Sequence, residues 1–354
     1  MAAWRPQLPP GGRLVAMPRA KKYYVVGRRQ LELRDEEVAE PAPGEVLIRT
    51  RVSAVSVGTE VWRYVNGGHY GGEGSTCGYN SSGVVVAVGD GVTSLQPGDA
   101  VFTTEPHADL MLAQARHVLR LPPGVDFETA AFTYLPTLGL HALRSAGYQP
   151  GDNVLIVGQG IVGLLAALVA RMIGARVAAL EIDPARRGLA EQAGLTPVLD
   201  PLDAAALDRL EMFFGAPGPD VVVETSQSWS GLLDATRLAS RETRIAIVGI
   251  FRTEPTGEVA REVLRHTFMD RDQFHNQHVR FIGCSNDPND DYPPGVVRWT
   301  IQRNMQYIAD QIADGRLDPT PAITHRVRWD ELGQVYEQLS EGERGMVGVT
   351  LHWD

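Results

Sequence analysis

The segment Val154-Leu-Ile-Val-Gly-Gln-Gly-Ile-Val-Gly163 decides the fold of this chain. An apolar run turns into the pattern Gly158-x-Gly160-x-x-Gly163, and a Leu/Ala-rich segment typical of a helix follows it. This order of strand, turn and helix is the fingerprint of a dinucleotide-binding unit. Gly158 permits the tight turn, Gly160 lets the backbone approach a pyrophosphate, and Gly163 lets the helix pack close to the strand. The free N–H groups at the start of the helix would face the phosphate charge.

An acidic side chain follows the second strand of this unit. We expect that strand over residues 176–180, and Glu181 comes directly after it, about 20 residues beyond the glycines. A carboxylate at this position accepts hydrogen bonds from the adenosine ribose and repels a 2′-phosphate. Arg186 and Arg187 lie just beyond, and arginine could pair with such a phosphate. The pattern favours NAD over NADP as the cofactor.

The composition bounds the class of protein and its partners. The 354 residues are enough for two domains, and the hydrophobic fraction of 44% is ordinary for a globular enzyme. A net charge of −10 argues against nucleic acid or an anionic membrane surface as a partner. The two cysteines, Cys77 and Cys284, are too few for a disulfide framework and suit a reducing cytoplasm. We expect a disordered leader over residues 1–16, and the apolar stretch 161–173 is too short to span a bilayer.

The hydrophobic pattern divides the chain into two kinds of structure. Short alternating runs broken by Gly and Pro predict a β-rich, barrel-like domain, with strands at residues 22–26, 45–55, 83–88, 100–103 and 109–112. From about residue 132 to residue 285 strands and helices alternate, which is typical of a parallel sheet covered on both faces. Helical stripes at residues 301–312 and 332–339 precede a final strand at 347–352, which could return to the β-rich domain.

This organisation resembles the medium-chain dehydrogenase/reductase family. The resemblance rests on the fingerprint and on the segments Glu45-Val-Leu-Ile-Arg49, Val88-Gly-Asp-Gly-Val92, Pro97-Gly-Asp-Ala-Val-Phe102, His107-Ala-Asp-Leu110 and Gly151-Asp-Asn-Val-Leu-Ile-Val-Gly158. It implies an α/β fold with a GroES-like β-rich catalytic domain over residues 17–136 and 289–354. The Rossmann NAD-binding domain, a doubly wound parallel sheet, would occupy residues 137–288. A homodimer or homotetramer is common in the family.

The positions that bind zinc in many members of that family carry other residues here. Zinc-dependent relatives have a cysteine, a histidine and a third ligand where this chain resembles them at Val57, Tyr79 and Thr133. None of these three is a usual zinc ligand, and the four-cysteine structural lobe is absent. Cys77 near Tyr79 and His69 could form an improvised site, although a small cysteine packed in a turn is the simpler interpretation. We therefore predict neither catalytic nor structural zinc.

Without zinc, side chains must move the proton and steady the substrate oxygen. The resemblance assigns the proton relay to Thr59 and places Glu60 on the substrate floor, while the Tyr79 phenol could donate a hydrogen bond to the substrate. His275 lies in a segment that resembles members oxidising sugars, glycosides or cyclitols, and histidine can act as acid or base. Each candidate has a structural alternative: a capped turn for Thr59 and Glu60, packing for Tyr79, and a structural histidine for His275.

Two further sets of residues complete the predicted site. The candidate substrate contacts are Trp62, Tyr64, His69 and Asn276. The predicted cofactor contacts are Gly158, Gly160, Ile161, Val162, Gly163, Glu181, Arg186, Thr137, Thr225, Ser226, Val248 and Ile250. The family resemblance implies that Thr137 packs on the nicotinamide ring. It also implies that the backbone at residues 248–250 binds the carboxamide group of that ring.

The sequence thus favours zinc-independent, NAD-dependent oxidation of a secondary hydroxyl on a polar cyclic substrate, or the reverse reduction. The substrate could be a sugar, glycoside, nucleoside or cyclitol. Three alternatives stay open. One is an NADPH-dependent quinone or enoyl reductase. Another is oxidation of a tetrapyrrole hydroxyl, because Gly58-Thr59-Glu60 resembles a segment of bacteriochlorophyllide dehydrogenases. The last is a catalytically inactive protein that binds NAD.

Overall fold

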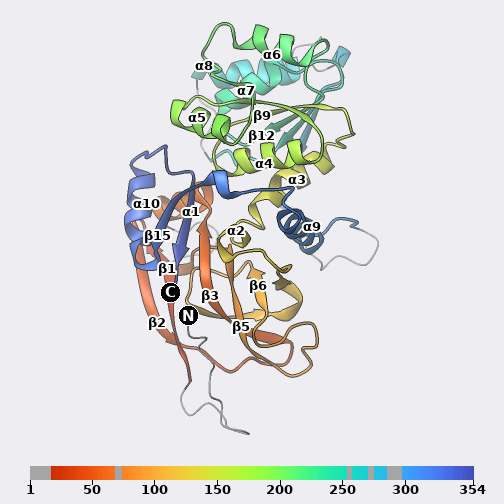
Figure 1. Cartoon of the computed structure of the whole chain (residues 1–354). Coiled ribbons are helices and arrows are strands. Elements are labelled where there is room, and N and C mark those ends of the chain that lie inside the picture. The colour runs from red at the N-terminus through yellow and green to blue at the C-terminus, as the bar shows by residue number, and fades with distance from the viewer. Residues whose placement is uncertain (1–16, 68–73, 253–256, 270–274, 285–296) are drawn as a thin grey trace.

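The computed structural model describes residues 17–67, 74–252, 257–269, 275–284 and 297–354. A sheet of six strands with its helices forms one part of the molecule and lies in the upper half of Figure 1, and a β-rich domain forms the lower half. The expected leader, residues 1–16, lies outside the described residues. Among the described residues, no helix combines the length and the apolar character that a membrane span requires.

The upper sheet is entirely parallel and has the strand order β11-β10-β9-β12-β13-β14. Its strands are β9 (Asn153–Val157), β10 (Arg176–Leu180), β11 (Val198–Leu199), β12 (Val221–Glu224), β13 (Arg244–Ile247) and β14 (Arg280–Gly283). The helices of this part are α3 (Leu135–Ser145), α4 (Ile161–Met172), α5 (Pro184–Gln192), α6 (Ala206–Phe214), α7 (Trp229–Arg237) and α8 (Gly257–Leu264). The order is that of a dinucleotide-binding Rossmann sheet, so this prediction is confirmed.

The β-rich domain is built around the long strand β3 (Glu45–Val55). One sheet runs β15-β16-β3-β5-β6-β8, with β7 also paired to β3, and a smaller sheet runs β2-β1-β4. The other strands are β1 (Arg19–Gly27), β2 (Gln30–Glu37), β4 (Ser75–Thr76), β5 (Ser81–Val88), β6 (Ala100–Thr103), β7 (Leu110–Gln114), β8 (Leu119–Arg120), β15 (Ile323–Arg328) and β16 (Gly348–His352). Its helices are α1 (Val57–Asn66), α2 (Phe127–Ala130), α9 (Ile301–Ala313) and α10 (Leu332–Ser340), with short helical turns at 115–117, 320–322 and 329–331.

The C-terminal segment completes the β-rich sheet, as predicted. Strand β16 pairs antiparallel with β3, so that Val349 lies opposite Val55. Strand β2 was not predicted, because its alternating charged residues hide two leucines, Leu31 and Leu33. It pairs with β1 over nearly its whole length.

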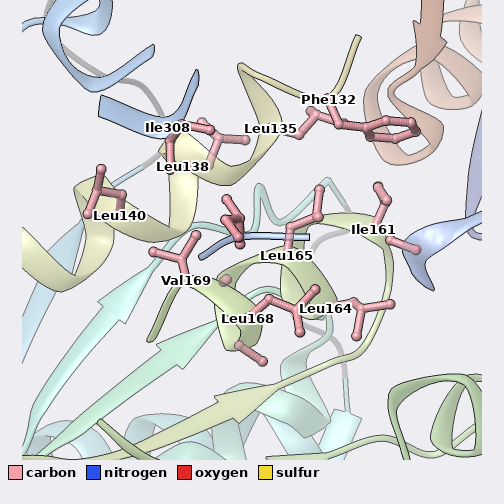
Figure 2. Close-up of a cluster of buried hydrophobic side chains, with 14 of the residues drawn as sticks. Phe132, Leu135, Leu138, Leu140, Ile161, Leu164, Leu165, Leu168, Val169 and Ile308 are labelled. Carbon is pink, nitrogen blue, oxygen red and sulfur yellow. The ribbon is translucent and has the colours of Figure 1, made fainter. Parts of the chain in front are cut away.

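A shared core joins the two parts. Gly139 allows helices α3 and α4 to cross closely, because it has no Cβ. A Cβ there would lie only 2.5 Å from the Ala166 Cβ. Figure 2 shows leucines of both helices pointing into this core, with Ile308 of α9 beside them. The domain boundary expected between residues 136 and 137 falls inside α3. The second expected boundary, at 288 and 289, lies outside the described residues.

Candidate active site

The glycine loop between β9 and α4 has the geometry that the sequence predicts. Gly158 has a φ of +89°, and a Cβ there would lie 2.9 Å from the Ser226 Cα. A Cβ on Gly163 would lie 2.0 Å from the Gly158 carbonyl oxygen. A Cβ on Gly160 would meet nothing closer than Arg186 Nη1 at 4.0 Å, so this position is open to a ligand. Helix α4 starts at Ile161, so the N–H groups of its first turn have no partner within the helix.

Glu181 is held next to that loop. The residue follows β10, is buried, and its Oε2 accepts a hydrogen bond from the Gln159 backbone N–H at 2.6 Å. Its Oε1 accepts a second bond from the Asp183 N–H at 2.8 Å. Since each carboxylate oxygen has two lone pairs, both oxygens can still accept a bond from a ribose hydroxyl.

The two arginines after Glu181 have different surroundings. The Arg186 Nε donates to the Arg344 carbonyl oxygen at 3.2 Å, across to the C-terminal segment. Burial, together with the positive charge of Arg344, lowers the pKa of Arg186. Arg187 instead donates to the Glu181 carbonyl oxygen at 2.9 Å and pairs with Asp200 at 3.1 Å. Arg186 therefore lies beside the glycine loop, and Arg187 is engaged in packing around β10.

The loops that follow β12 and β13 lie at the same carboxyl edge of the sheet. The Thr225 hydroxyl donates to the carbonyl oxygens of Val157 and Gly158 at 2.9 and 3.1 Å. Backbone N–H groups of Val248 and Gly249 both donate to the Glu224 carbonyl oxygen, at 2.9 and 3.0 Å. The predicted residues Thr225 and Ser226 therefore lie beside the glycine loop, and the segment with Val248 and Ile250 is tied to the end of β12.

Three contacts join this edge to helix α1 of the β-rich domain. Arg252 Nη1 donates to the Gly58 carbonyl oxygen at 2.6 Å. A Cβ on Gly58 would lie 3.0 Å from the Gln227 Nε2. The Arg252 guanidinium also lies over the Trp62 ring, 4.6 Å from its centroid. The start of α1 therefore faces the carboxyl edge of the parallel sheet, where ligands of such sheets bind.

Three hydroxyl groups meet at the start of α1. The Tyr79 hydroxyl donates a hydrogen bond to Ser56 Oγ, and the Thr59 hydroxyl lies near enough to the same phenol to oppose the effect of burial on its pKa. Burial raises the pKa of Tyr79, so the phenol stays protonated and available as a donor at neutral pH. Its ring packs edge-on against Tyr134, with centroids 5.6 Å apart. Close by on α3, the buried Thr137 donates its hydroxyl to the Tyr134 carbonyl oxygen at 2.6 Å.

Glu60 and Tyr64, predicted for catalysis and substrate contact, belong to a buried core instead. Residues four apart share one face of a helix, so the two side chains point together away from Thr59. The Glu60 carboxylate has no exposed surface and accepts bonds from the Ser56 N–H at 2.6 Å and the Tyr336 hydroxyl at 2.5 Å. The Tyr64 hydroxyl donates to Glu337 of α10 at 2.5 Å. Glu60 and Tyr64 therefore hold α1 against α10 and are not part of the candidate active site.

His275 and Asn276 lie at the wrong edge of the sheet for catalysis. They precede β14, and the neighbouring Gln277 carbonyl oxygen accepts a bond from the Glu242 N–H, just before β13, at 2.6 Å. Since β13 and β14 are parallel, the residues before them lie at the amino edge, opposite the glycine loop. The sequence could not show this, because edge and face depend on strand pairing. His69 lies outside the described residues.

The three positions that resemble zinc ligands do not fit a zinc ion. Val57 has no donor atom, Tyr79 is bound to Ser56, and the Thr133 hydroxyl donates to the Ala130 carbonyl oxygen at 2.7 Å. In the part of the chain that the structure describes, no three His, Cys, Asp or Glu side chains gather to hold a metal.

Three residues of the site were missed in the sequence. Ser56 directly precedes Val57, and its role depends on the approach of Tyr79. Glu224 ends the apolar run Val221-Val-Val, and a polar residue at the end of a buried strand was a readable signal. Arg252 carries no such signal, because its partner Gly58 is 194 residues away in the chain.

Comparison with known families agrees with this architecture. Residues 42–129 match the alcohol dehydrogenase GroES-like domain, and residues 162–300 match the family described as zinc-binding dehydrogenase. These two matches fall on the β-rich domain and on the Rossmann part.

Individual relatives are distant but extensive. The chain is 24% identical to 2-dehydro-3-deoxy-L-galactonate 5-dehydrogenase of Pseudoalteromonas atlantica, over 78% of this chain and 82% of the relative. It is 23% identical to sorbitol dehydrogenase of Halalkalibacterium halodurans, over 89% and 94% of the two chains. The crystal structure of 2R,3R-butanediol dehydrogenase from Bacillus subtilis superposes with a TM-score of 0.78 at 18% identity, covering 95% of this chain and 100% of the other. This last likeness shows the shared fold.

Proposed function

The chain belongs to the medium-chain alcohol dehydrogenase family, and from that premise we propose an NAD-dependent, zinc-independent oxidation of a secondary hydroxyl. The proposed substrate is a polar cyclic molecule such as a sugar, glycoside, nucleoside or cyclitol, and the reverse reduction uses the same groups. The relatives that act on a galactonate derivative and on sorbitol support a substrate rich in hydroxyl groups.

The observation that carries the proposal is the hydroxyl cluster of Ser56, Thr59 and Tyr79 at the start of α1. It faces the carboxyl edge of the sheet, and its Tyr79 stands at a position that the family resemblance matches to a zinc ligand of relatives. Bound NAD supplies the hydride acceptor. When substrate is bound, the single Tyr79 hydroxyl proton would turn from Ser56 Oγ to the substrate oxygen and steady the charge that develops there. Ser56 and Thr59 orient that phenol and offer hydroxyl groups through which the substrate proton can pass to the solvent.

Two groups support NAD as the cofactor. The Glu181 carboxylate is anchored by the Gln159 and Asp183 N–H groups and presents negative charge where a 2′-phosphate would lie. Arg187, which could compensate that charge, is tied to Asp200. Arg186 lies by the glycine loop, where its positive charge suits the pyrophosphate.

The remaining parts of the proposal concern the setting of the enzyme. We place it in a reducing cytoplasm, because Cys77 and Cys284 are both buried free thiols. We propose a homodimer or homotetramer that acts on a small molecule and uses neither nucleic acid nor membrane as a partner, in keeping with the net charge of −10.

A second candidate is an NADPH-dependent quinone or enoyl reductase, which the lack of metal donors at Val57, Tyr79 and Thr133 also favours. One experiment separates the candidates: purified protein is analysed for zinc, titrated with NADH and NADPH, and assayed on sugars, cyclitols and quinones. We expect no stoichiometric zinc, tighter binding of NADH, and turnover on a polyol that survives chelator treatment. Preference for NADPH with quinone turnover would establish the second candidate. Tight binding of NAD without turnover on any substrate would indicate an inactive protein.

A further inference from the structure

Glu224, the last residue of β12, is a buried acid with one carboxylate oxygen unused. Its Oε1 accepts hydrogen bonds from the Ser226 backbone N–H at 2.7 Å and from the Ser226 hydroxyl. Its Oε2 has no hydrogen-bond partner among the described residues, although the side chain has no exposed surface. Burying a carboxylate oxygen without a hydrogen-bond partner is unfavourable, so a functional role for this oxygen is worth seeking.

The position of this oxygen relates it to the cofactor site. A Cβ on Gly249 would lie 2.7 Å from Glu224 Oε2 and 2.9 Å from the Gln227 nitrogen. The carboxylate is therefore packed between the loops that follow β12 and β13. These loops border the glycine turn, since a Cβ on Gly158 would lie 2.9 Å from the Ser226 Cα.

The order of the strands tells which half of a dinucleotide lies there. The pyrophosphate belongs at the glycine loop after β9, and Glu181 takes the adenosine half on the side of β10. The nicotinamide half must extend to the other side, over the ends of β12 and β13. Glu224 and Gly249 lie at those ends.

We infer that Glu224 makes the site select the oxidised nicotinamide over the reduced one, and that binding of NAD⁺ releases a proton from this carboxyl group. The inference rests on the proposed function, because it takes the bound molecule to be a nicotinamide dinucleotide. The nicotinamide ring is a cation in NAD⁺ and neutral in NADH. An ionised carboxylate nearby attracts the first and not the second. The proton lost by Glu224 passes to the solvent buffer, which keeps the charges balanced.

The ionisation of Glu224 is suited to such coupling. Burial raises its pKa to about 7, although the hydrogen bonds from Ser226 and the nearby Gln227 backbone N–H favour the ionised form. The charged or titratable side chains on the elements packed against it are His141 and Arg144 of α3, Asp234 and Arg237 of α7, Arg244 of β13, and Arg252. None of them is among the causes of the shift. A cationic ring would therefore be the main charge to act on this carboxyl group.

The test compares the two redox forms of the cofactor in the wild-type protein and in Glu224→Gln. Binding is followed by titration calorimetry in buffers of different ionisation enthalpy, so that proton release is measured together with Kd. For the wild type we expect a fraction of a proton released per NAD⁺ bound near pH 7, none for NADH, and an NAD⁺ affinity that rises with pH through this range. In Glu224→Gln the release should vanish, and the ratio of the NAD⁺ and NADH dissociation constants should shift roughly tenfold towards NADH.

Asp234→Asn is the matched control, because burial raises the pKa of this second carboxyl group to about 6. Asp234 lies on α7, and its replacement should leave the proton release and the NAD⁺-to-NADH ratio unchanged. An unchanged ratio in Glu224→Gln, or wild-type NAD⁺ binding without proton release, would overturn the inference. The second result needs no variant, so it holds even if Glu224→Gln fails to fold. If the wild type binds no nicotinamide dinucleotide at all, it is the proposed function that fails.

Discussion

Glu60 Oε2 lies 2.9 Å from His107 Nε2, and neither side chain has exposed surface. The second ring nitrogen of His107 is 2.8 Å from Ser53 Oγ, which accepts a hydrogen bond from Trp353 Nε1 at 2.9 Å. Burial by itself would raise the pKa of Glu60. The charge and hydrogen bond of His107, with the bonds from Tyr336 and Ser56, outweigh burial and lower it. The pair therefore ties α1 to β3, α10 and the C-terminus, with both oxygens of the Glu60 carboxylate hydrogen-bonded.

Glu60→Gln should lower the free energy of unfolding by about 3 kcal/mol at pH 7, since it removes one partner of a buried pair. The pKa of Glu60 is lowered in the folded state. The stabilisation is therefore present above the unfolded pKa and lost as the pH falls through the folded one. Urea denaturation at several pH values measures this. Glu337→Gln, which alters a partly exposed partner of Tyr64, is the control and should cost less than about 1 kcal/mol. Normal stability with turnover abolished would return Glu60 to the catalytic site.

Tyr79→Phe should lower turnover roughly 100-fold, because it removes the proposed donor to the substrate oxygen and keeps the ring. The dissociation constant of NAD should change little. The matched control is Tyr64→Phe, which loses a hydroxyl bonded to Glu337 on the other face of α1. It should reduce stability by about 1 kcal/mol and leave turnover unchanged. Equal turnover in the two variants would count against the hydroxyl cluster.

The glycines of the fingerprint should respond differently to alanine. In Gly163→Ala the new Cβ would lie 2.0 Å from the Gly158 carbonyl oxygen, so the protein should be strongly destabilised. In Gly160→Ala the nearest atom would be 4.0 Å away, so the fold should persist while NAD binding weakens at least tenfold. Thermal denaturation and fluorescence titration with NADH measure the two effects. Tight NADH binding by Gly160→Ala would place the pyrophosphate elsewhere.

His275→Ala should retain wild-type turnover, because the residue precedes β14 at the amino edge of the sheet. Thr59→Val is the contrasting variant and should reduce turnover, since the Thr59 hydroxyl lies beside the Tyr79 phenol. Steady-state kinetics on the polyol that proves active decides between them. A large loss of turnover in His275→Ala with an unchanged fold would contradict the assigned edge.

Glu224→Gln should change how stability depends on pH. The folded pKa of about 7 lies above the unfolded value, so folding favours the protonated acid. Its stabilising contribution is complete at low pH and is lost as the pH rises through about 7. Relative to Glu224→Gln, the wild type should lose on the order of 3 kcal/mol between pH 5 and pH 8. Denaturant midpoints that run parallel for both proteins across this range would refute the shift.

Local patterns allowed much of the fold to be predicted. Strands β3, β6 and β10 begin and end where alternation and turn residues indicate. The Gly158-x-Gly160-x-x-Gly163 turn and Glu181 lie as expected, because strand, turn and helix are consecutive in the chain. Strand β2 escaped prediction because its charged residues pair with β1 without burying an apolar face.

The sequence by itself determined the dinucleotide fold and the identity of the residues at the three metal-like positions, since both depend on residue type and short spacing. Only the tertiary structure decided which candidates meet. It brought Tyr79 to Ser56 and Thr59, and it turned Glu60 and Tyr64 into the core through the helical period of α1. It also moved His275 to the opposite edge through the pairing of β13 with β14. Pairing between segments far apart in the chain decides which side chains meet. Residue types and short spacings in the sequence do not reveal that pairing.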